Sequence, residues 1–294
     1  MLALPPKHIV SLVLARRGHA RGSYGEADAR LRRALADAEA ARPPDPLALA
    51  AALNALGLLR KDLARYQEAS GYYRRALGLL EGRDELYADQ IATLYHNLGG
   101  VEHARAEYAA GEAFARRGLA IRAAIPGSDP CALAADQAAL AAILDGQEQW
   151  DEAERLYLDA IATLEHARGD YPHDLAVALA GLGAQYLRRE RPEAALPLLS
   201  RAAVLKTRAL GASHPHTAVT LNNLAMAYRR TGDPTRAAAL YAQALEILER
   251  SLGPDHPNVV TCRRNLSQLH PERSEGPTPP ASSSGRAGPS LRSG

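Results

Sequence analysis

The sequence is poor in lysine and in net charge, but only the low net charge narrows the possible partners. Lysine occurs only at Lys7, Lys61 and Lys206, so nearly all of the 35 basic residues are arginine. Together with the abundance of alanine, this bias indicates a GC-rich bacterial genome rather than a function. The formal net charge is only +2, which gives no strong field to attract nucleic acid or an anionic membrane. We therefore expect neither as a partner.

Cysteine and long apolar runs are also scarce. Cys131 and Cys262 are the two cysteines, and they show neither metal nor redox spacing, which suits a reduced protein. No run approaches the roughly 20 apolar residues of a membrane span. The start of the chain is interrupted by Pro5-Pro6-Lys7-His8, and it lacks the basic segment and cleavage site of a signal peptide. The expected location is the cytoplasm.

Signatures of catalysis are missing as well. No Ser/His/Asp set, Cys/His set or recurring pair of carboxylates stands out. Gly181-x-Gly183 does not follow a strand, so it is not a nucleotide-binding loop. The spacing of His214 and His216 is compatible with a metal site, but a capping loop at a helix start is the stronger alternative. We expect no catalytic residue, no metal and no cofactor.

The dominant feature of the sequence is a repeat of 42 residues. Its marker leucines are Leu14, Leu56, Leu98, Leu140, Leu182, Leu224 and Leu266. Small residues follow each marker leucine and recur 13 and 20 positions after it, whereas position 17 is usually bulky, as at Tyr73, Tyr157 and Tyr241. Such a pattern allows two helix backbones to cross closely, with the bulky side chain filling the gap. The repeat therefore predicts stacked pairs of helices.

The punctuation inside each unit agrees with a helical hairpin. In the last full unit, apolar residues follow a helical spacing up to Tyr228 and again from Ala237. Between them, Thr231-Gly232-Asp233-Pro234 supplies a stop, an N-cap and a first-turn proline. A glycine and an X-Pro pair mark most junctions between units, but residues 79–88 contain Gly82 without a proline, which predicts a looser junction.

The predicted fold is all-α, a solenoid of helix-turn-helix units. Residues 1–7 form a leader, and residues 8–270 form six 42-residue repeats plus a closing helix over 258–269 that covers the last apolar face. Residues 271–294 are rich in Pro, Ser and Gly and are expected to be disordered, without an assigned role. Gly111 and Gly118 stand where other units have alanine, so we expect that unit to be the least stable.

These residues resemble the tetratricopeptide repeat, whose usual period is about 34 residues. The 42-residue form, with Leu-Asn-Asn-Leu-Ala at residues 221–225 and Leu-Gly-x-x-His-Pro at residues 210–215 and 252–257, is similar to the repeats of kinesin light chains and their bacterial relatives. The resemblance implies a right-handed superhelix whose first helices line a concave groove. It also implies that groove asparagines hold a bound peptide.

Helical spacing places the residues two before, two after and five after each marker leucine on the groove wall. An asparagine amide has one acceptor and two donor hydrogens, so it can bind a peptide backbone without reading its sequence, and arginine can pair with carboxylates. The alternative is that the asparagines bond neighbouring helices or solvate the groove. The candidate peptide-binding residues are Asn54, His96, Asn97, Asn222, Asn223, Met226, Arg229, Arg264 and Asn265.

The middle of the groove is small and apolar, with a floor formed by Ala138, Ala142, Ala180 and Ala184. An exposed apolar hollow usually marks a partner site. We therefore expect a scaffold that binds an unidentified peptide or protein segment in its groove. A ligand-sensing regulatory array of a bacterial signalling system is the alternative, and an enzyme or nucleic-acid binder is the third possibility. The sequence specifies neither the partner nor an oligomeric state.

Overall fold

The computed structural model describes residues 24–167 and 172–269, and within these ranges the ordered elements are all helices. The all-α fold class predicted from the sequence is confirmed. The helices are α2 (Tyr24–Ala40), α3 (Pro46–Asp62), α4 (Tyr66–Leu80), α5 (Asp84–Ala104), α6 (Tyr108–Ala123), α7 (Pro130–Gly146), α8 (Trp150–His166), α9 (Pro172–Arg188), α10 (Pro192–Leu210), α11 (Pro215–Arg230), α12 (Pro234–Leu252) and α13 (Pro257–Ser267).

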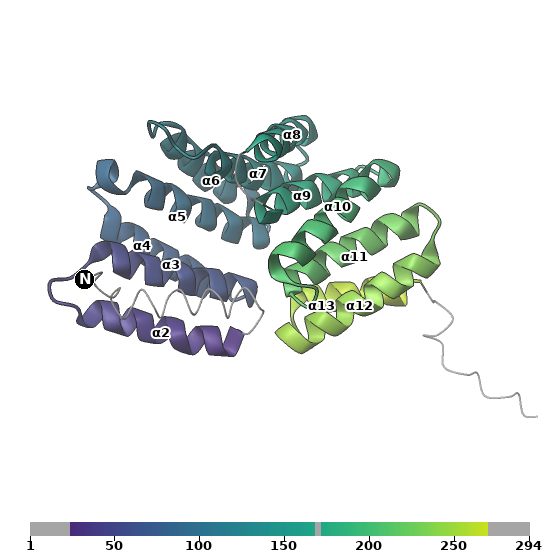
Figure 1. Cartoon of the computed structure of the whole chain (residues 1–294), viewed down its shortest axis with the longest axis horizontal. Helices are drawn as coiled ribbons and strands as arrows, with labels where there is room; N and C mark the ends of the chain where they lie inside the picture. Colours follow the sequence, from purple (N-terminus) through teal and green to yellow (C-terminus); the bar gives the residue numbers. More distant parts are fainter. Residues whose placement is uncertain (1–23, 168–171, 270–294) are drawn as a thin grey trace, which may run out of the picture.

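The helices form a solenoid of hairpins. The pairs α3–α4, α5–α6, α7–α8, α9–α10 and α11–α12 each pack against the next pair, and α13 packs against α12 (Figure 1). Helix α2 stands in the position of a second helix. The first helix expected from residue 8, the leader 1–7 and the tail 271–294 lie outside the described residues.

The starts of the first helices follow from short capping motifs. Asp45, Asp129, His214 and His256 each accept a hydrogen bond from a backbone N–H of the first turn, and each precedes a proline. The side chain satisfies a donor that would otherwise lack a partner, and proline tolerates the first helical position because it has no N–H to satisfy. The X-Pro pairs of the sequence thus fix where these helices begin.

The turns inside the hairpins share one backbone device. Ala64, Ala106, Glu148, Glu190 and Gly232 all have positive φ, between 55° and 86°, and they are 42 residues apart. A left-handed residue just past a helix end lets the chain reverse. Only one of these positions carries the glycine that makes this conformation easy.

The junction without a proline is irregular, as the sequence predicts. Gly82 has φ of 76°, and the N-cap residue of α5, Arg83, makes no side-chain capping bond. Tyr87 interrupts the helix with φ −123° and ψ 22°. Without a proline to set the first turn, α5 begins early and bends before it joins the wall.

The core follows the predicted offsets of small and bulky residues. Ala69, Ala153 and Ala237 are completely buried. Tyr73, Tyr157 and Tyr241 are at most 2% exposed and occupy the centre of their hairpins. Because the same two positions are buried in each hairpin from α3–α4 to α11–α12, the apolar core is distributed along the stack in several clusters rather than gathered at one centre.

For the variant Gly118→Ala, helix propensity and tertiary packing predict opposite changes in stability. Helix propensity alone predicts that Gly118→Ala stabilises by up to about 1 kcal/mol. A Cβ at this position, however, would lie 2.9 Å from the carbonyl oxygen of Ala92 and 3.1 Å from the Cβ of Tyr95. Overpacking costs about 1–3 kcal/mol, so we expect a net loss of about 1 kcal/mol in urea unfolding.

The matched control is Gly71→Ala in α4, where nothing lies within 4 Å of the added Cβ. This variant should gain about 0.5–1 kcal/mol from helix propensity alone. If both variants were stabilised equally, the close approach of α5 and α6 at Gly118 would have no energetic meaning.

Candidate functional site

The inner wall of the solenoid consists of the first helices of the hairpins. Helices α3, α5, α7, α9, α11 and α13 contact one another in sequence, so their inward faces form one continuous surface. The described second helices make no comparable contacts with one another, which places them on the outer side of the stack. Any ligand of the concave side would therefore contact side chains of these six helices.

Four of the predicted asparagines are bonded to one another across neighbouring helices. Asn97 Nδ2 donates to Asn54 Oδ1 at 2.7 Å, and Asn265 Nδ2 donates to Asn222 Oδ1 at 3.0 Å. Asn97, Asn222 and Asn265 are buried. This is the geometry of the alternative in which the asparagines bond neighbouring helices. A role for them in holding a ligand stays a prediction.

The sequence contains a signal for these two bonds. In both pairs the donor lies one residue before its marker leucine and the acceptor lies two residues before the preceding one, a separation of 43 residues. Asn223 lies at the donor position, one residue before Leu224, but the acceptor position in the preceding repeat is occupied by Ala180, which has no side-chain acceptor. It accepts a bond from Asn222 Nδ2 at 3.2 Å and stays partly exposed.

The remaining candidates at the C-terminal end of the wall are accessible. Met226 and Arg229 are partly exposed on α11, and Arg264 is exposed on α13. Arg229 Nη1 donates to Gln268 Oε1 at 3.1 Å, which links α11 to the end of α13. These side chains and Asn223 are the predicted groove residues that a ligand could reach on this part of the wall.

His96 takes part in a polar network around a buried carboxylate and is itself partly exposed. Its Nδ1 lies 2.8 Å from Asp136 Oδ1, and Arg122 Nε donates to Asp136 Oδ2 at 2.5 Å. Asp136 is 3% exposed. The carboxylate thus connects α5, α6 and α7, and His96 keeps 30% of its side chain exposed.

The predicted alanine floor is partly covered. Ala138 is buried, whereas Ala142, Ala180 and Ala184 are partly exposed on α7 and α9. The same stretch carries an ion pair between Asp145 and Arg188 that joins α7 to α9. The middle of the wall therefore offers a shallow apolar strip with charged residues along one border.

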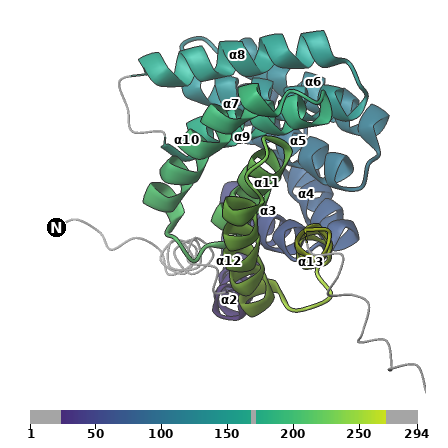
Figure 2. The same cartoon turned by 90° about the vertical axis from the view of Figure 1, so that its right-hand side faces the viewer.

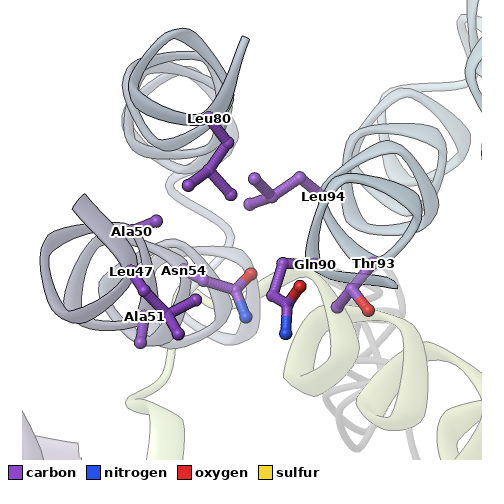
Figure 3. A pocket seen from close by; sticks show the side chains of 8 residues that line it. All are labelled: Leu47, Ala50, Ala51, Asn54, Leu80, Gln90, Thr93 and Leu94. Carbon is purple, nitrogen blue, oxygen red and sulfur yellow. The ribbon is translucent and has the colours of Figure 1, made fainter. Parts of the chain in front are cut away.

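A cavity of about 190 Å³ opens between α3, α4 and α5, and most of its lining was missed from the sequence. Figure 3 shows Leu80 and Leu94 pointing toward each other on one side and the amides of Asn54 and Gln90 on the other. Leu47 and Ala51 lie nine and five residues before the marker leucine Leu56. The predicted stripe begins two residues before the marker leucine. Continuing it toward the N-terminus by one helical turn reaches Ala51, and a second turn reaches Leu47. The lining residues are Leu47, Ala50, Ala51, Asn54, Leu80, Gln90, Thr93 and Leu94.

The polar groups of this cavity differ in how far they are already satisfied. Thr93 Oγ1 accepts from Arg122 Nη2 at 3.0 Å and donates to the carbonyl of Asp89. Asn54 accepts from Asn97 through Oδ1. Among the described residues, no partner binds the Asn54 amide nitrogen or the Gln90 amide. The cavity can therefore take an apolar side chain and bond the adjacent backbone.

The two ends of the described solenoid meet at Asp62, which no sequence pattern predicts. His256 Nε2 lies 3.1 Å from the Asp62 carbonyl oxygen, and His216 Nε2 lies 3.3 Å from Asp62 Oδ2. Leu252 packs against the apolar cluster around Tyr24 and Leu59. In Figures 1 and 2 the ends of α2 and α3 accordingly lie beside α11, α12 and α13.

The histidines at this contact have defined structural roles. His214 caps α11 and His256 caps α13, each accepting a backbone N–H through Nδ1. Within residues 24–167 and 172–269, no group of three or more His, Cys, Asp or Glu side chains is arranged to hold a metal. In the same ranges, no helix combines the length and apolarity needed to cross a bilayer.

Sequence profiles described as "Tetratricopeptide repeat" match residues 52–87, 137–174, 174–250 and 223–275. Curated proteins give no significant match. The complex of NprR with its cognate peptide NprX is similar over 92% of this chain and 72% of that chain, with 13% identity and a TM-score of 0.64.

Two further solved structures have a similar fold. A Rap protein complexed with Competence and Sporulation Factor aligns over 92% of this chain and 78% of that chain, with 12% identity and a TM-score of 0.63. BtubC from P. vanneervenii aligns over 79% of this chain and 98% of that chain, with 18% identity and a TM-score of 0.50. At such identities the similarity concerns the fold alone.

Proposed function

The chain belongs to the tetratricopeptide repeat family, and we propose that its concave wall binds an extended peptide or protein segment without catalysing a reaction. The observation that carries the proposal is the cavity between α3 and α5, where three leucines adjoin two amides that point inward. A mainly apolar hollow with a few convergent polar groups is the usual form of a recognition site.

In this proposal the cavity receives one apolar side chain of the ligand. The Asn54 and Gln90 amides bond the backbone on either side of it, which requires an extended segment with free N–H and C=O groups. Lys61 lies seven residues after Asn54 on the same face of α3, about 10 Å along the helix axis. That length spans about three residues of an extended peptide, so an acidic residue three positions from the apolar one would meet Lys61.

The partly exposed alanines and the C-terminal part of the wall would extend the contact. Ala142 and Ala184 provide the shallow apolar strip, and Asn223, Met226, Arg229 and Arg264 provide polar and apolar contacts beyond it. Because the wall is formed before binding, most of the ordering cost would fall on the ligand. As part of the same proposal the protein acts in the cytoplasm, where a reducing environment suits the thiols of Cys131 and Cys262.

A regulatory array that senses a ligand is the second candidate, because the two ends of the solenoid touch. NprR, which has a similar fold, was solved with its cognate peptide. An enzyme is disfavoured by the composition of the wall, although an aspartyl phosphate phosphatase from Bacillus subtilis also has a similar fold. A ligand that changes the contact at Asp62 would favour the sensor, and a ligand that leaves it unchanged would favour the scaffold.

A binding experiment with two groove variants tests the proposal. The probe is the tightest 12-residue peptide selected against the wild-type protein from a random phage-displayed library. Ala51→Glu puts a charge at the cavity and Ala184→Glu puts one on the alanine strip. Each should raise the Kd at least about tenfold, equivalent to about 1.4 kcal/mol, because a carboxylate next to apolar ligand atoms loses hydration. Fluorescence anisotropy measures the change.

The control is Ala110→Glu on α6, an exposed position on an outer helix. It should change the Kd less than about twofold, since it is remote from the wall. Circular dichroism must show equal helix content in all variants. Unchanged binding in both groove variants would remove the support for recognition on the inner wall.

A further inference from the structure

The contact that closes the solenoid joins residues far apart in the chain. Asp62 lies at the end of α3 and is 8% exposed through its side chain, whereas His256 lies 194 residues later. We infer that Asp62, His216, His256 and Leu252 form a pH-dependent clasp that holds the solenoid closed as a ring and limits entry to its inner wall. This inference does not depend on the identity of any ligand.

The geometry fixes the protonation of His256 in the closed state. Its Nδ1 accepts the N–H of Asn258 at 3.1 Å, so the proton must be on Nε2. Nε2 donates to the carbonyl oxygen of Asp62 at 3.1 Å, because a carbonyl can only accept. Burial lowers the pKa of His256 below the ordinary histidine range. The neutral ring therefore makes two hydrogen bonds: it accepts one as the cap of α13 and donates one to the end of α3.

His216 is the member of the clasp whose charge changes the contact. Its Nε2 lies 3.3 Å from Asp62 Oδ2, and its side chain is 40% exposed, so protons reach it from solvent. Protonation would turn the contact into an ion pair with a carboxylate that is nearly buried. Opposite charges at this distance attract more strongly near a buried carboxylate than in bulk water. Protonation of His216 should therefore strengthen closure.

The surrounding groups do not reproduce this change. A cavity of about 270 Å³ at the seam is lined by Tyr24, Lys61, Tyr66 and His103, besides the clasp itself. Burial raises the pKa of both tyrosines and lowers the pKa of His103.

Among the described residues, two groups on α9 and α10 and one on α11 also belong to the electrostatic surroundings. Burial lowers the pKa of His173, and the charges of Asp62, His216 and Lys206 also act on this pKa. Burial lowers the pKa of Lys206 to about 8. His214 Nδ1 accepts the N–H of His216 as the cap of α11. A comparison between about pH 6 and pH 7.5 therefore leaves Lys206 predominantly charged and the tyrosines neutral.

Apolar packing gives the clasp a component that does not depend on pH. Leu252, at the end of α12, contacts the cluster that contains Tyr24, Leu31 and Leu56. Burying such a side chain favours closure at every pH. Packing thus contributes a constant term to the equilibrium between the open and closed forms. Protonation of His216 changes only the contribution of the His216–Asp62 contact, so it can shift that equilibrium.

Single-molecule FRET on the full chain tests the clasp. Gln67→Cys and Arg250→Cys place a donor and an acceptor on exposed positions beside the seam. The native thiols of Cys131 and Cys262 are at most 4% exposed, and burial raises the pKa of Cys262 to about 11, so labelling favours the introduced thiols. Lowering the pH from about 7.5 to about 6 should raise the ratio of high- to low-transfer molecules roughly fivefold.

Three variants separate the clasp from general effects of pH. His216→Gln should lose the pH dependence and stay as open as the wild type at pH 7.5. His216→Lys keeps a cation beside Asp62 and should stay closed at both pH values. His166→Gln alters a histidine that bonds within α8 and should behave like the wild type. A wild-type ratio that does not change with pH, or a His216→Gln variant that changes as the wild type does, overturns the inference.

Discussion

Replacing Arg122 with leucine should lower the free energy of unfolding by about 3–5 kcal/mol, the cost of leaving the buried Asp136 carboxylate without its guanidinium partner. Arg122 is 4% exposed at the end of α6. It donates through Nε to Asp136, through Nη1 to Asp89 and through Nη2 to Thr93. Asp89 is 62% exposed and can be hydrated, but the side chain of Asp136 is only 4% exposed. The loss therefore arises mainly at Asp136.

Urea unfolding followed by circular dichroism measures this effect. The control is Arg116→Leu on the same helix, where the guanidinium is 46% exposed and pairs with Glu112 and Glu152. Exposed ion pairs contribute at most about 1 kcal/mol. Adding Asp136→Asn to Arg122→Leu removes the buried charge that has lost its guanidinium and should restore at least half of the lost stability. An equal loss in the single and double variants would show that the charge is not the cause.

Replacing Lys206 with leucine should have the opposite result, a gain of about 2–3 kcal/mol at pH 7. Lys206 is 8% exposed on α10, and no residue within 24–167 or 172–269 forms a hydrogen bond or ion pair with its ammonium group. Burial lowers its pKa from 10.5 to about 8. At 1.36 kcal/mol for each pKa unit, holding this lysine charged in the fold costs about 3 kcal/mol.

The pH dependence identifies the cause of that gain. Between about pH 8 and 10.5 the unfolded chain keeps the lysine proton that the folded chain has released. Wild-type stability therefore rises with pH across this window. The advantage of Lys206→Leu should be full below pH 8 and should fade toward pH 10. A constant difference would point to packing instead, and Arg201→Leu on the exposed side of α10 should show neither effect.

Arg122 and Lys206 occupy the same position in the 42-residue repeat. Each lies 24 residues after its marker leucine, where three other units have the core residues Leu80, Leu164 and Leu248. The sequence therefore identifies both as exceptions to one core position. It does not reveal that Arg122 has a buried carboxylate beside it whereas Lys206 has none, because that depends on which side chains of other helices come near.

For the candidate site, the sequence predicted the wall and some of its accessible residues, such as Asn223 and Arg264. It left open whether Asn97 and Asn222 would bond neighbouring helices or a ligand, and in the structure they bond neighbouring helices. Amide chemistry is the same for a peptide and for a neighbouring asparagine. Only the distance between adjacent helices decides which partner the amide meets.

The sequence by itself determined the units of this protein: helical hairpins, their length, their caps at residues such as Asp45 and their small and bulky core positions. These depend on contacts within a hairpin or between neighbours, which a 42-residue period specifies directly. The tertiary structure alone decided how far the stack curves. Small rotations add up over successive units, so the meeting of Asp62 with His216 and His256 depends on all of them together.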